Sequence, residues 1–398
     1  MTIPVASSSG TDAVSSRLIF LLASACGLIV ANIYYAQPLA GPISEALGLS
    51  PHAAGLIVTL TQIGYGTGLL LIVPLGDLVE NRRLTLVLIG IATIGLVGAA
   101  LSPHALPFLL ASLLIGLGSV AVQVLVPYAA HLAPEAIRGR VVGNVMSGLL
   151  LGIMLARPVA SFIAELASWR AVFLLSIVAM GAIALVLRRA LPPRLPASKL
   201  RYRELLASMA RLAATTPVLQ RRAIYHACLF AAFSLFWTTT PLLLTGPEFG
   251  LSQGGIALFA LAGVAGAVAS PIAGRLADRG WMRSATAVAM VMVAGAFLLT
   301  HLAPSGSTAA LVLLVVAAIL LDFGVAANLT LGQRAIFVLG AELRSRLNGL
   351  YMATFFLGGA IGSAAGGWAY AQGGWTLASW IGFGLPVAAL AYSATERG

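Results

Sequence analysis

The chain has 398 residues, of which 60% are hydrophobic and only 9% are charged, and its mean hydropathy is +0.99. A soluble globular domain carries about 25% charged residues, so this composition excludes a soluble protein and a disordered one. Both cysteines, Cys26 and Cys228, lie inside apolar runs, which excludes a disulfide-bonded secreted scaffold. The net charge of +11 is explained below by topology, and we expect no nucleic-acid partner.

Twelve apolar runs follow one another along the chain, each near the roughly 20 residues that a membrane-spanning helix needs. The runs are continuous rather than alternating, which favours helices over the strands of a barrel. They cover residues 16–37, 51–75, 84–102, 107–130, 141–164, 170–188, 221–245, 253–273, 284–302, 309–333, 347–370 and 376–394. The sequence therefore predicts an all-α membrane protein with twelve transmembrane helices in the lipid bilayer.

Basic residues predict the orientation of these helices. With the N-terminus in the cytoplasm, all but Arg157 and Arg170 of the 23 Lys and Arg residues fall on the cytoplasmic side. Residues 1–15 carry no basic cluster and precede a full-length apolar run, so we expect a retained cytoplasmic tail and no cleaved signal. These features predict a multi-pass membrane protein with both termini in the cytoplasm. We further expect a monomer, in a bacterial cytoplasmic (inner) membrane.

One connection, from Arg188 to Arg222, is much longer than the others and divides the chain six helices to six. The predicted domains are a tail (1–15), a first six-helix bundle (16–188), a cytoplasmic linker (189–220), a second six-helix bundle (221–394) and a C-terminal tail (395–398). Within the linker, the apolar residues Leu205, Leu206, Met209 and Leu212 fall on one helical face. This pattern is typical of a short helix on the anionic inner leaflet; a solvated linker is the alternative.

The two halves repeat each other at offsets of 201 to 206 residues. Asp77 and Asp278 follow the second helix of each half, and Trp169 and Trp375 precede the sixth. Arg140 and Arg346 open the fifth, and Pro38 and Pro241 lie near the end of the first. Parallel six-helix halves are typical of transporters in which one bundle rocks against the other around a central site.

Small residues recur every fourth position on the second, fifth, eighth and eleventh helices, as in Gly148 and Gly152. Such stripes permit close helix contact in lipid. They comprise Gly64, Gly68, Gly148, Gly152, Ala156, Ala160, Gly266, Ser270, Gly274, Gly358, Gly362 and Gly366. We predict that they form the sliding interface between the bundles; packing within each bundle is the alternative.

Catalytic signatures are missing from the sequence. It has no Ser-His-Asp arrangement, no His or Cys at metal-ligand spacing and no nucleotide-binding loop, and its five histidines are dispersed. We therefore expect neither enzymatic activity, nor a metal site, nor a cofactor.

The charged segments after the second helix of each half carry a family resemblance. The signature G-x-L-A-D-R-x-G-R-K is closely matched by the segment that begins at Gly274, whereas the first copy departs at Val73, Glu80 and Asn81. Over nearly its whole length the chain resembles the major facilitator superfamily, and in particular its bacterial sugar and drug efflux permeases. The residues that correspond to the gating motif are Gly76, Asp77, Arg82, Arg83, Gly274, Asp278, Arg279 and Arg283. The resemblance implies that Asp77, with Arg82, latches the outward-facing state.

Two ionisable residues lie inside the predicted bilayer, Asp322 in the tenth helix and Arg157 in the fifth. Such residues are costly and are functional candidates by default. We predict that Asp322 takes up and releases the coupling proton, because burial favours the neutral carboxyl; a structural hydrogen bond is the alternative. Arg157 either assists Asp322 or extends to the outer surface, and the difference in depth along the two helices leaves a pairing open.

By analogy with the family, helices one, four, seven and ten line the substrate cavity, and helix two contributes to it. Their buried polar and aromatic residues include Asn32, Tyr35, Gln37, Gln62, Tyr65, Gln123, Tyr128, Trp237, Thr238 and Asn328. Amide, hydroxyl and ring groups suit a neutral or singly charged amphipathic molecule, or a sugar. The resulting hypothesis is efflux of small organic molecules driven by the proton gradient; the alternative is a facilitator or proton symporter for sugars or other metabolites.

Overall fold

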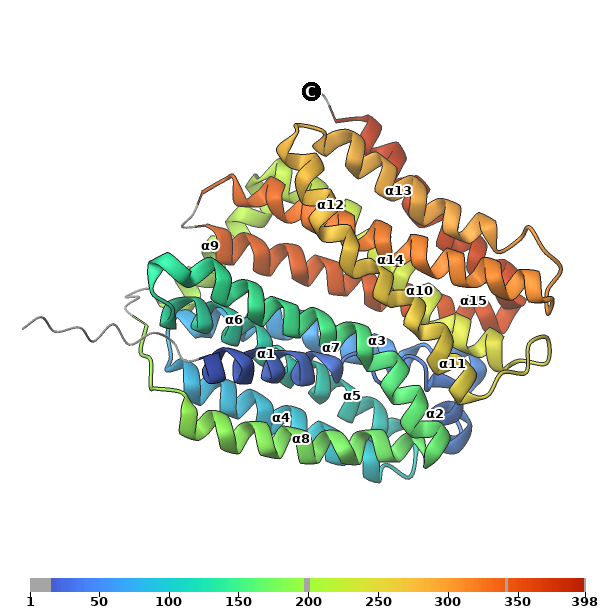
Figure 1. Ribbon diagram of the computed structural model, residues 1–398, viewed down its shortest axis with the longest axis horizontal. Helices are drawn as coiled ribbons and strands as arrows, with labels where there is room; N and C mark the ends of the chain where they lie inside the picture. Colours follow the sequence, from blue (N-terminus) through green and yellow to red (C-terminus); the bar gives the residue numbers. More distant parts are fainter. Residues whose placement is uncertain (1–15, 197–200, 341–342, 397–398) are drawn as a thin grey trace, which may run out of the picture.

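The computed structural model describes residues 16–196, 201–340 and 343–396, and every regular element in these ranges is a helix (Figure 1). The predicted tail at 1–15 lies outside the described residues, as do parts of the linker and the C-terminal tail. Ten helical stretches are long and apolar enough to cross a membrane. The described part of the chain is therefore all-α, as the composition predicts.

The first half of the chain forms the lower bundle in Figure 1. Its elements are α1 (Ser16–Ala31), α2 (Ala40–Leu47), η1 (Pro51–Ala53), α3 (Leu56–Leu71), η2 (Val73–Asp77), α4 (Asn81–Leu101), α5 (Ala105–Ser119), α6 (Ala121–Leu132), η3 (Glu135–Ile137), α7 (Arg138–Leu166) and α8 (Trp169–Ala190), where η marks a 3₁₀ helix. Helices α5 and α6 together make the fourth predicted crossing.

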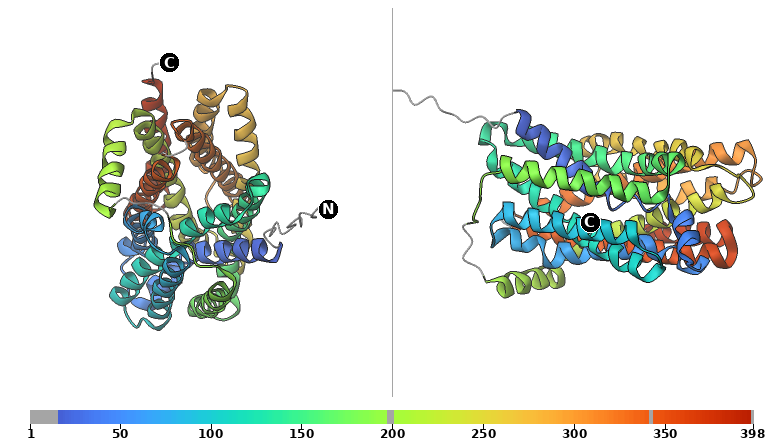
Figure 2. Two further views of the ribbon diagram at one scale, coloured as in Figure 1. Left: turned by 90° about the vertical axis from the view of Figure 1, so that its left-hand side faces the viewer. Right: turned by 90° about the horizontal axis from the view of Figure 1, so that it is seen from below.

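The second half forms the upper bundle, which the end-on view of Figure 2 separates from the first. Its elements are α9 (Tyr202–Thr215), α10 (Pro217–Thr245), α11 (Gln253–Ala260), η4 (Leu261–Ala265), α12 (Gly266–Asp278), α13 (Met282–Leu299), α14 (Thr308–Phe337) and α15 (Arg344–Ala394). Helix α15 makes two crossings, because Gly373 and Gly374 leave the helical conformation and Gly374 has a φ of 60° that glycine tolerates.

The first helix is shorter than predicted, since α1 ends at Ala31 instead of residue 37. The chain continues through hydrogen-bonded turns, such as Ile33 N–H to the Val30 carbonyl, before α2 begins. Pro38 prevents the helix from resuming at residue 37, because it lacks a backbone N–H and disfavours a helical conformation in the residue before it. With this helix and the two halves of α15, the predicted twelve crossings are all represented.

The two ends of the molecule differ in what they carry. One end, here called the linker end, holds α9, Asp77 and the Gln220–Arg222 segment; the opposite end, here called the far end, holds α2 and the connection from Gly246 to Ser252 (Figure 1). Large apolar side chains cover the outside between these ends, for example Phe20, Ile94 and Val178, each at least 64% exposed. This apolar belt fits a surrounding bilayer.

The prediction that the small-residue stripes form the interface between bundles is wrong. A Cβ on Gly152 would fall on the backbone of Gly27 in α1, and one on Gly64 would fall on Leu113 in α5. Similarly, Gly358 and Gly362 of α15 lie against α10. A Cβ added to Gly266 of α12 would lie 3.3 Å from the carbonyl oxygen of Asp322 in α14. The stripes therefore join helices of one bundle, because the tightest backbone approaches occur there.

The bundles meet along the same helices through other faces, since α3 contacts α15 and α7 contacts α11 and η4. Gly55 and Gly367 face each other closely enough that a Cβ on Gly367 would lie 2.6 Å from the Gly55 nitrogen. One turn further, the Thr59 hydroxyl lies 2.8 Å from the Ser363 hydroxyl and 3.2 Å from the Ala360 carbonyl oxygen. These contacts join the bundles in the half of the molecule nearer the far end, and glycine and hydroxyl residues permit the close approach.

Helix α9 confirms that the linker contains a short helix, but its apolar face is covered by protein. Leu205 and Met209 are buried, and Met209 approaches Gly349 of α15. The Tyr202 hydroxyl donates a hydrogen bond of 2.6 Å to the Leu71 carbonyl at the end of α3. The expectation that this face lies on the leaflet is therefore wrong, since α15 offers it an apolar surface.

Candidate functional site

The two membrane-embedded charges lie together although they come from different bundles. Arg157 of α7 is 2% exposed and Asp322 of α14 is 8% exposed. Both face Gly263 in η4, where an added Cβ would lie 3.1 Å from Arg157 Nη1 and 3.5 Å from Asp322 Oδ1. Among the described residues, the ion pairs are Arg222–Glu396 and Arg334–Asp278, so Arg157 and Asp322 are close without being directly paired.

Trp237 of α10 connects the two charges. Its indole Nε1–H donates a hydrogen bond of 3.0 Å to Asp322 Oδ2. The Arg157 Cζ atom lies over the same ring, 4.1 Å from its centroid. A desolvated cation on the face of a tryptophan gains about 2 kcal/mol. One indole therefore stabilises the carboxylate with its edge and the guanidinium with its face.

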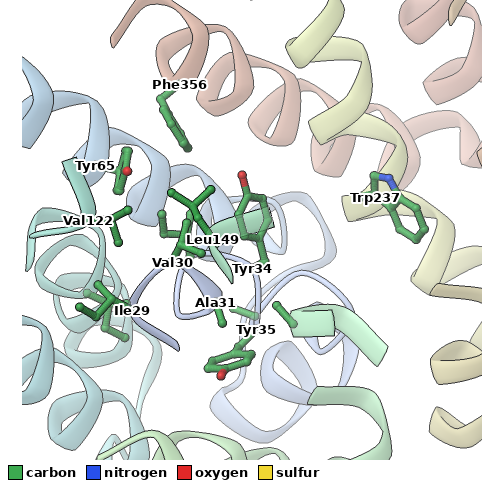
Figure 3. Close-up of a cluster of buried hydrophobic side chains, with 14 of the residues drawn as sticks. Ile29, Val30, Ala31, Tyr34, Tyr35, Tyr65, Val122, Leu149, Trp237 and Phe356 are labelled. Carbon is green, nitrogen blue, oxygen red and sulfur yellow. The ribbon is translucent and has the colours of Figure 1, made fainter. Parts of the chain in front are cut away.

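Further groups complete the surroundings of Arg157. Its Nε–H donates to Gln37 Oε1 at 3.0 Å, and the rings of Phe233 and Tyr34 lie 4.9 and 5.6 Å from its Cζ atom. Figure 3 shows Tyr34 pointing its hydroxyl toward the region between Phe356 and Trp237, whereas Tyr35 points the opposite way. The alternative in which Arg157 extends to the outer surface is therefore wrong, because aromatic faces and an amide oxygen hold the cation inside.

The length of the arginine side chain explains why the two charges lie closer together than their depths along the helices suggest. Those depths are depths of the two backbones, whereas the guanidinium group lies at the end of a flexible side chain that spans part of the distance between them. At the other side, Gly263 has no side chain to separate the two charges.

Three predicted cavity residues form a second cluster at the contact between bundles. Gln62 Nε2 donates to the Ser234 hydroxyl of α10 at 2.8 Å. Gln123 Nε2 donates to the Tyr65 hydroxyl at 3.0 Å, and the Tyr65 ring lies 4.3 Å from that of Phe356 in α15. This cluster and the charged pair lie on the same buried interface.

A third polar contact lies within the second bundle. Asn328 Nδ2 is 2.9 Å from His226 Nδ1. The imidazole is stacked between Tyr351 and Phe355, at centroid distances of 5.3 and 4.6 Å. His226 is therefore a packed, hydrogen-bonded residue.

Other predicted cavity residues point elsewhere. The amide of Asn32 is engaged by the Ile29 carbonyl and by Ser176 and Met180 of α8, inside the first bundle. Tyr128 donates to the Pro192 carbonyl at the linker end. Tyr35 lines a groove between α1 and α7 whose other residues include the exposed Phe20 and Leu151. The structure therefore does not bring these three residues to the charged pair, because sequence position does not give the direction of a side chain around its helix. Thr238 is fully buried.

The gating motif is arranged differently from the expectation. Arg82 Nη1 donates to the Leu191 carbonyl at 3.2 Å and forms no ion pair with Asp77 within the part of the chain that the structure describes. Instead, the cations that act on Asp77 are Arg194 of the linker and Arg346 of α15. The carboxylate of the first bundle is thus within electrostatic reach of a cation of the second.

In the second copy of the motif the contacts stay within one bundle. Asp278 forms an ion pair with Arg334 of α14, and Arg283 donates to the Glu396 carbonyl at 2.8 Å. Gly76 accepts a hydrogen bond of 2.7 Å from Asn81 through its carbonyl. The side chains of Arg83 and Arg279 do not join these contacts in any hydrogen bond that the structure describes.

Sequence reasoning missed Phe233, Phe259 and Gly263 as neighbours of the charges. Phe233 had a detectable signal, because it precedes Trp237 by four residues and so lies on the same helical face. Gly263 had none, since its role depends on the packing of η4 between α7 and α14.

A cavity of about 430 Å³ lies away from this site, at the far end of the second bundle. Its lining includes Glu248, Tyr370 and Trp375, and none of the predicted site residues.

The comparison with known families decides what kind of protein carries this site. The family model described as Major Facilitator Superfamily matches residues 19–337. The chain belongs to the major facilitator superfamily. It is therefore a multi-pass membrane protein of a family of transporters, and the resemblance drawn from the motif is confirmed.

Relatives and solved structures agree. The chain is 41% identical over 361 residues to the uncharacterized transporter YgaY of Escherichia coli O157:H7, covering 91% of both chains. It is 31% identical to the probable transporter SCO4007 of Streptomyces coelicolor, over 93% of this chain and 85% of that one.

The fold is similar to a point mutant of the nucleoside transporter NupG (TM-score 0.75, 15% identity, 94% of this chain and 99% of that one). It is also similar to a bacterial homologue of the human lysosomal transporter Spinster in an inward-facing, unoccupied conformation (TM-score 0.68, 16% identity, 95% and 94%). At this identity the likeness shows the fold alone.

Proposed function

We propose that this transporter exports small organic molecules in exchange for protons, by alternating access, from the inner membrane of a bacterium. It works as a monomer with both termini in the cytoplasm, and it uses the proton gradient in place of a cofactor. The basic residues at the linker end support this orientation, since Arg82, Arg194 and Arg346 all lie there.

The observation that carries the proposal is the carboxylate of Asp322, buried where the two bundles meet. A charge in the membrane interior is costly, and here the negative charge at the edge of the Trp237 ring is balanced by Arg157, which lies over the face of that ring. A proton on Asp322 removes that balance and leaves Arg157 without its counter-charge. Because Arg157 belongs to the first bundle and Asp322 to the second, protonation changes the free energy that holds the bundles together.

The contacts between bundles support alternation between two arrangements. Near the far end the bundles are joined by Gly55 with Gly367 and by Thr59 with Ser363. At the linker end, Arg346 of the second bundle attracts the carboxylate of Asp77 in the first. We expect the far-end contacts to separate when that end opens, and Asp77 and Arg346 to approach each other as the linker end closes, with the charged site between them.

Proton exchange in proteoliposomes tests the proposal. Vesicles that contain the purified protein and the pH dye pyranine are exposed to gradients of ethidium, chloramphenicol, L-arabinose or L-leucine. We expect at least one probe to move protons in the opposite direction. Asp322→Asn abolishes this movement, whereas Glu135→Gln, an exposed carboxylate at the linker end, leaves it unchanged.

Trp237→Phe refines the same test. The variant keeps a ring beneath Arg157 but loses the N–H donor to Asp322, a hydrogen bond to a charged group worth about 1.5–3 kcal/mol. We therefore expect exchange to be strongly reduced without loss of folding. Probe movement that is independent of any proton gradient, and unaffected by Asp322→Asn, would identify a facilitator and refute proton coupling.

A further inference from the structure

The groups around the charged pair have hydrogen-bonding capacity that the protein does not use. A guanidinium group has several N–H donors, and within the described ranges Arg157 uses only Nε, toward Gln37. The Nε2 amide group of Gln37 is itself buried and without a partner. Donors on Arg157 and Gln37 therefore lie next to each other, in a place with no protein acceptor for them.

Asp322 presents the complementary feature. Its Oδ2 accepts the Trp237 N–H, whereas Oδ1, which faces Gly263, accepts no hydrogen bond from any side chain or backbone group that the structure describes. Buried donors and acceptors are almost always satisfied, by water or a ligand where the protein supplies no partner. The site thus offers unused donors on Arg157 and Gln37, and an unused anionic acceptor on Asp322 that faces Gly263 together with Arg157 Nη1.

The charge balance of the site restricts what can occupy it. Arg157 and Asp322 together are neutral, so a ligand with a single charge would leave one of the buried charges unmatched. A ligand with both charges matches each of them. Beside Trp237 lie the rings of Phe233 and Phe259, at centroid distances of 6.4 and 5.7 Å, which provide an apolar surface.

We propose that the substrate is a small zwitterion with an apolar side chain, of the amino-acid type. Its carboxylate binds the free N–H groups of Arg157 and Gln37, its ammonium group binds Asp322 Oδ1, and its side chain contacts the aromatic rings. This inference rests on the proposed export function and names its substrate class. Such a substrate also couples its own export to proton entry, because a proton and the ammonium group compete for the same carboxylate of Asp322.

Binding to the intact transporter in detergent tests the proposal independently of transport. The probes are L-phenylalanine and L-leucine, each with two matched analogues: the amide, which keeps the ammonium group and lacks the carboxylate, and the deaminated acid, which keeps only the carboxylate. Isothermal titration at neutral pH measures Kd. We expect a zwitterion to bind at least about tenfold more tightly than either of its analogues.

Variants separate the two halves of the site. Arg157→Gln is expected to weaken zwitterion binding by at least about tenfold and to change binding of the amide little. Asp322→Asn is expected to weaken zwitterion binding by at least about tenfold and to leave binding of the deaminated acid unchanged. Arg140→Gln, an exposed arginine on the same helix α7, is the matched control and keeps wild-type binding.

The ligand series on the unaltered protein decides the question even where a variant fails to fold. Equal binding of a zwitterion and its deaminated acid would overturn the role of Asp322 in recognition. Binding of neither zwitterion would overturn the substrate class, and it would leave proton exchange of other probes in proteoliposomes as the separate test of the proposed function.

Discussion

Glu80 shows how one side chain at the linker end organises its surroundings. Its carboxylate accepts hydrogen bonds from the backbone N–H groups of Arg82 at 2.7 Å and Arg83 at 2.8 Å, which caps α4. It also accepts one from the Arg194 N–H at 3.2 Å, which attaches the start of the linker. Partial burial works against the charge of Glu80, but these N–H groups outweigh that effect and hold its pKa below the ordinary value.

The pKa of Glu80 predicts a pH-dependent contribution to stability. Because the pKa is lowered in the folded protein, the contribution is fully present above the ordinary carboxyl pKa of about 4.3 and is lost as the pH falls through the folded value. Glu80→Gln keeps only one acceptor oxygen, so we expect a lower melting temperature at neutral pH. The difference from wild type should stay constant down to about pH 4.3 and shrink as the pH falls further.

Melting temperatures in detergent at a series of pH values measure this difference, with Glu135→Gln as the control. A difference that stays constant with pH would contradict the assignment to the ionised carboxylate.

At the scale of elements, glycine stripes determine which helices lie against each other. Gly148 and Gly152 of α7 receive α1, and Gly358 and Gly362 of α15 receive α10. Both pairs join the first and fifth helices of their own half, so the repeat in the sequence is also a repeat in packing. Close backbone approach of this kind replaces the hydrophobic driving force that helices lack in lipid.

Two glycines of the same helix give opposite predictions. Gly152→Ala places a methyl group on the Gly27 backbone, and overpacking of this kind costs about 1–3 kcal/mol. Gly143→Ala meets nothing within 4 Å, so it gains helix propensity of up to about 1 kcal/mol. Thermal stability of the purified variants, followed by size-exclusion chromatography after heating, should fall for the first and hold or rise for the second. Equal stability of the two would show that α1 and α7 are not in tight contact.

At the scale of the whole molecule, the contacts of α3 with α15 distinguish movement between bundles from packing within them. The hydroxyls of Thr59 and Ser363 lie 2.8 Å apart and belong to different bundles. Alternating access requires this pair to separate during each cycle, whereas contacts inside a bundle persist throughout.

A disulfide at this pair should therefore stop transport. In a background with Cys26→Ala and Cys228→Ala, we expect oxidation of the Thr59→Cys, Ser363→Cys double variant to abolish probe exchange in proteoliposomes, and reduction to restore it. The control is Gly98→Cys with Ala111→Cys, a pair within the first bundle where an added Cβ at Gly98 lies 3.1 Å from the Ala111 Cβ. Exchange that continues in the cross-linked double variant would refute separation at this interface.

Several site features were predictable because they depend on local composition. A carboxylate or guanidinium within an apolar run, such as Asp322 or Arg157, is conspicuous in any sequence. Gln37 and Trp237 were also identified, as polar or amphipathic residues on the expected helices, and the structure brings both to the charged pair. The direction of Tyr35 and Asn32 was not predictable, because it depends on the rotation of one helix against its neighbours.

The sequence by itself determined the helical class, the crossings, the division into two halves and the family of this transporter. Each of these follows from hydrophobicity and charge summed over about 20 residues, or from a repeat, and none requires knowledge of distant contacts. Tertiary structure alone decided that the stripes pack within bundles, that α3 meets α15, and that Trp237 lies between Arg157 and Asp322. These outcomes depend on helix rotation and on the reach of individual side chains, which are set only when all the helices pack together.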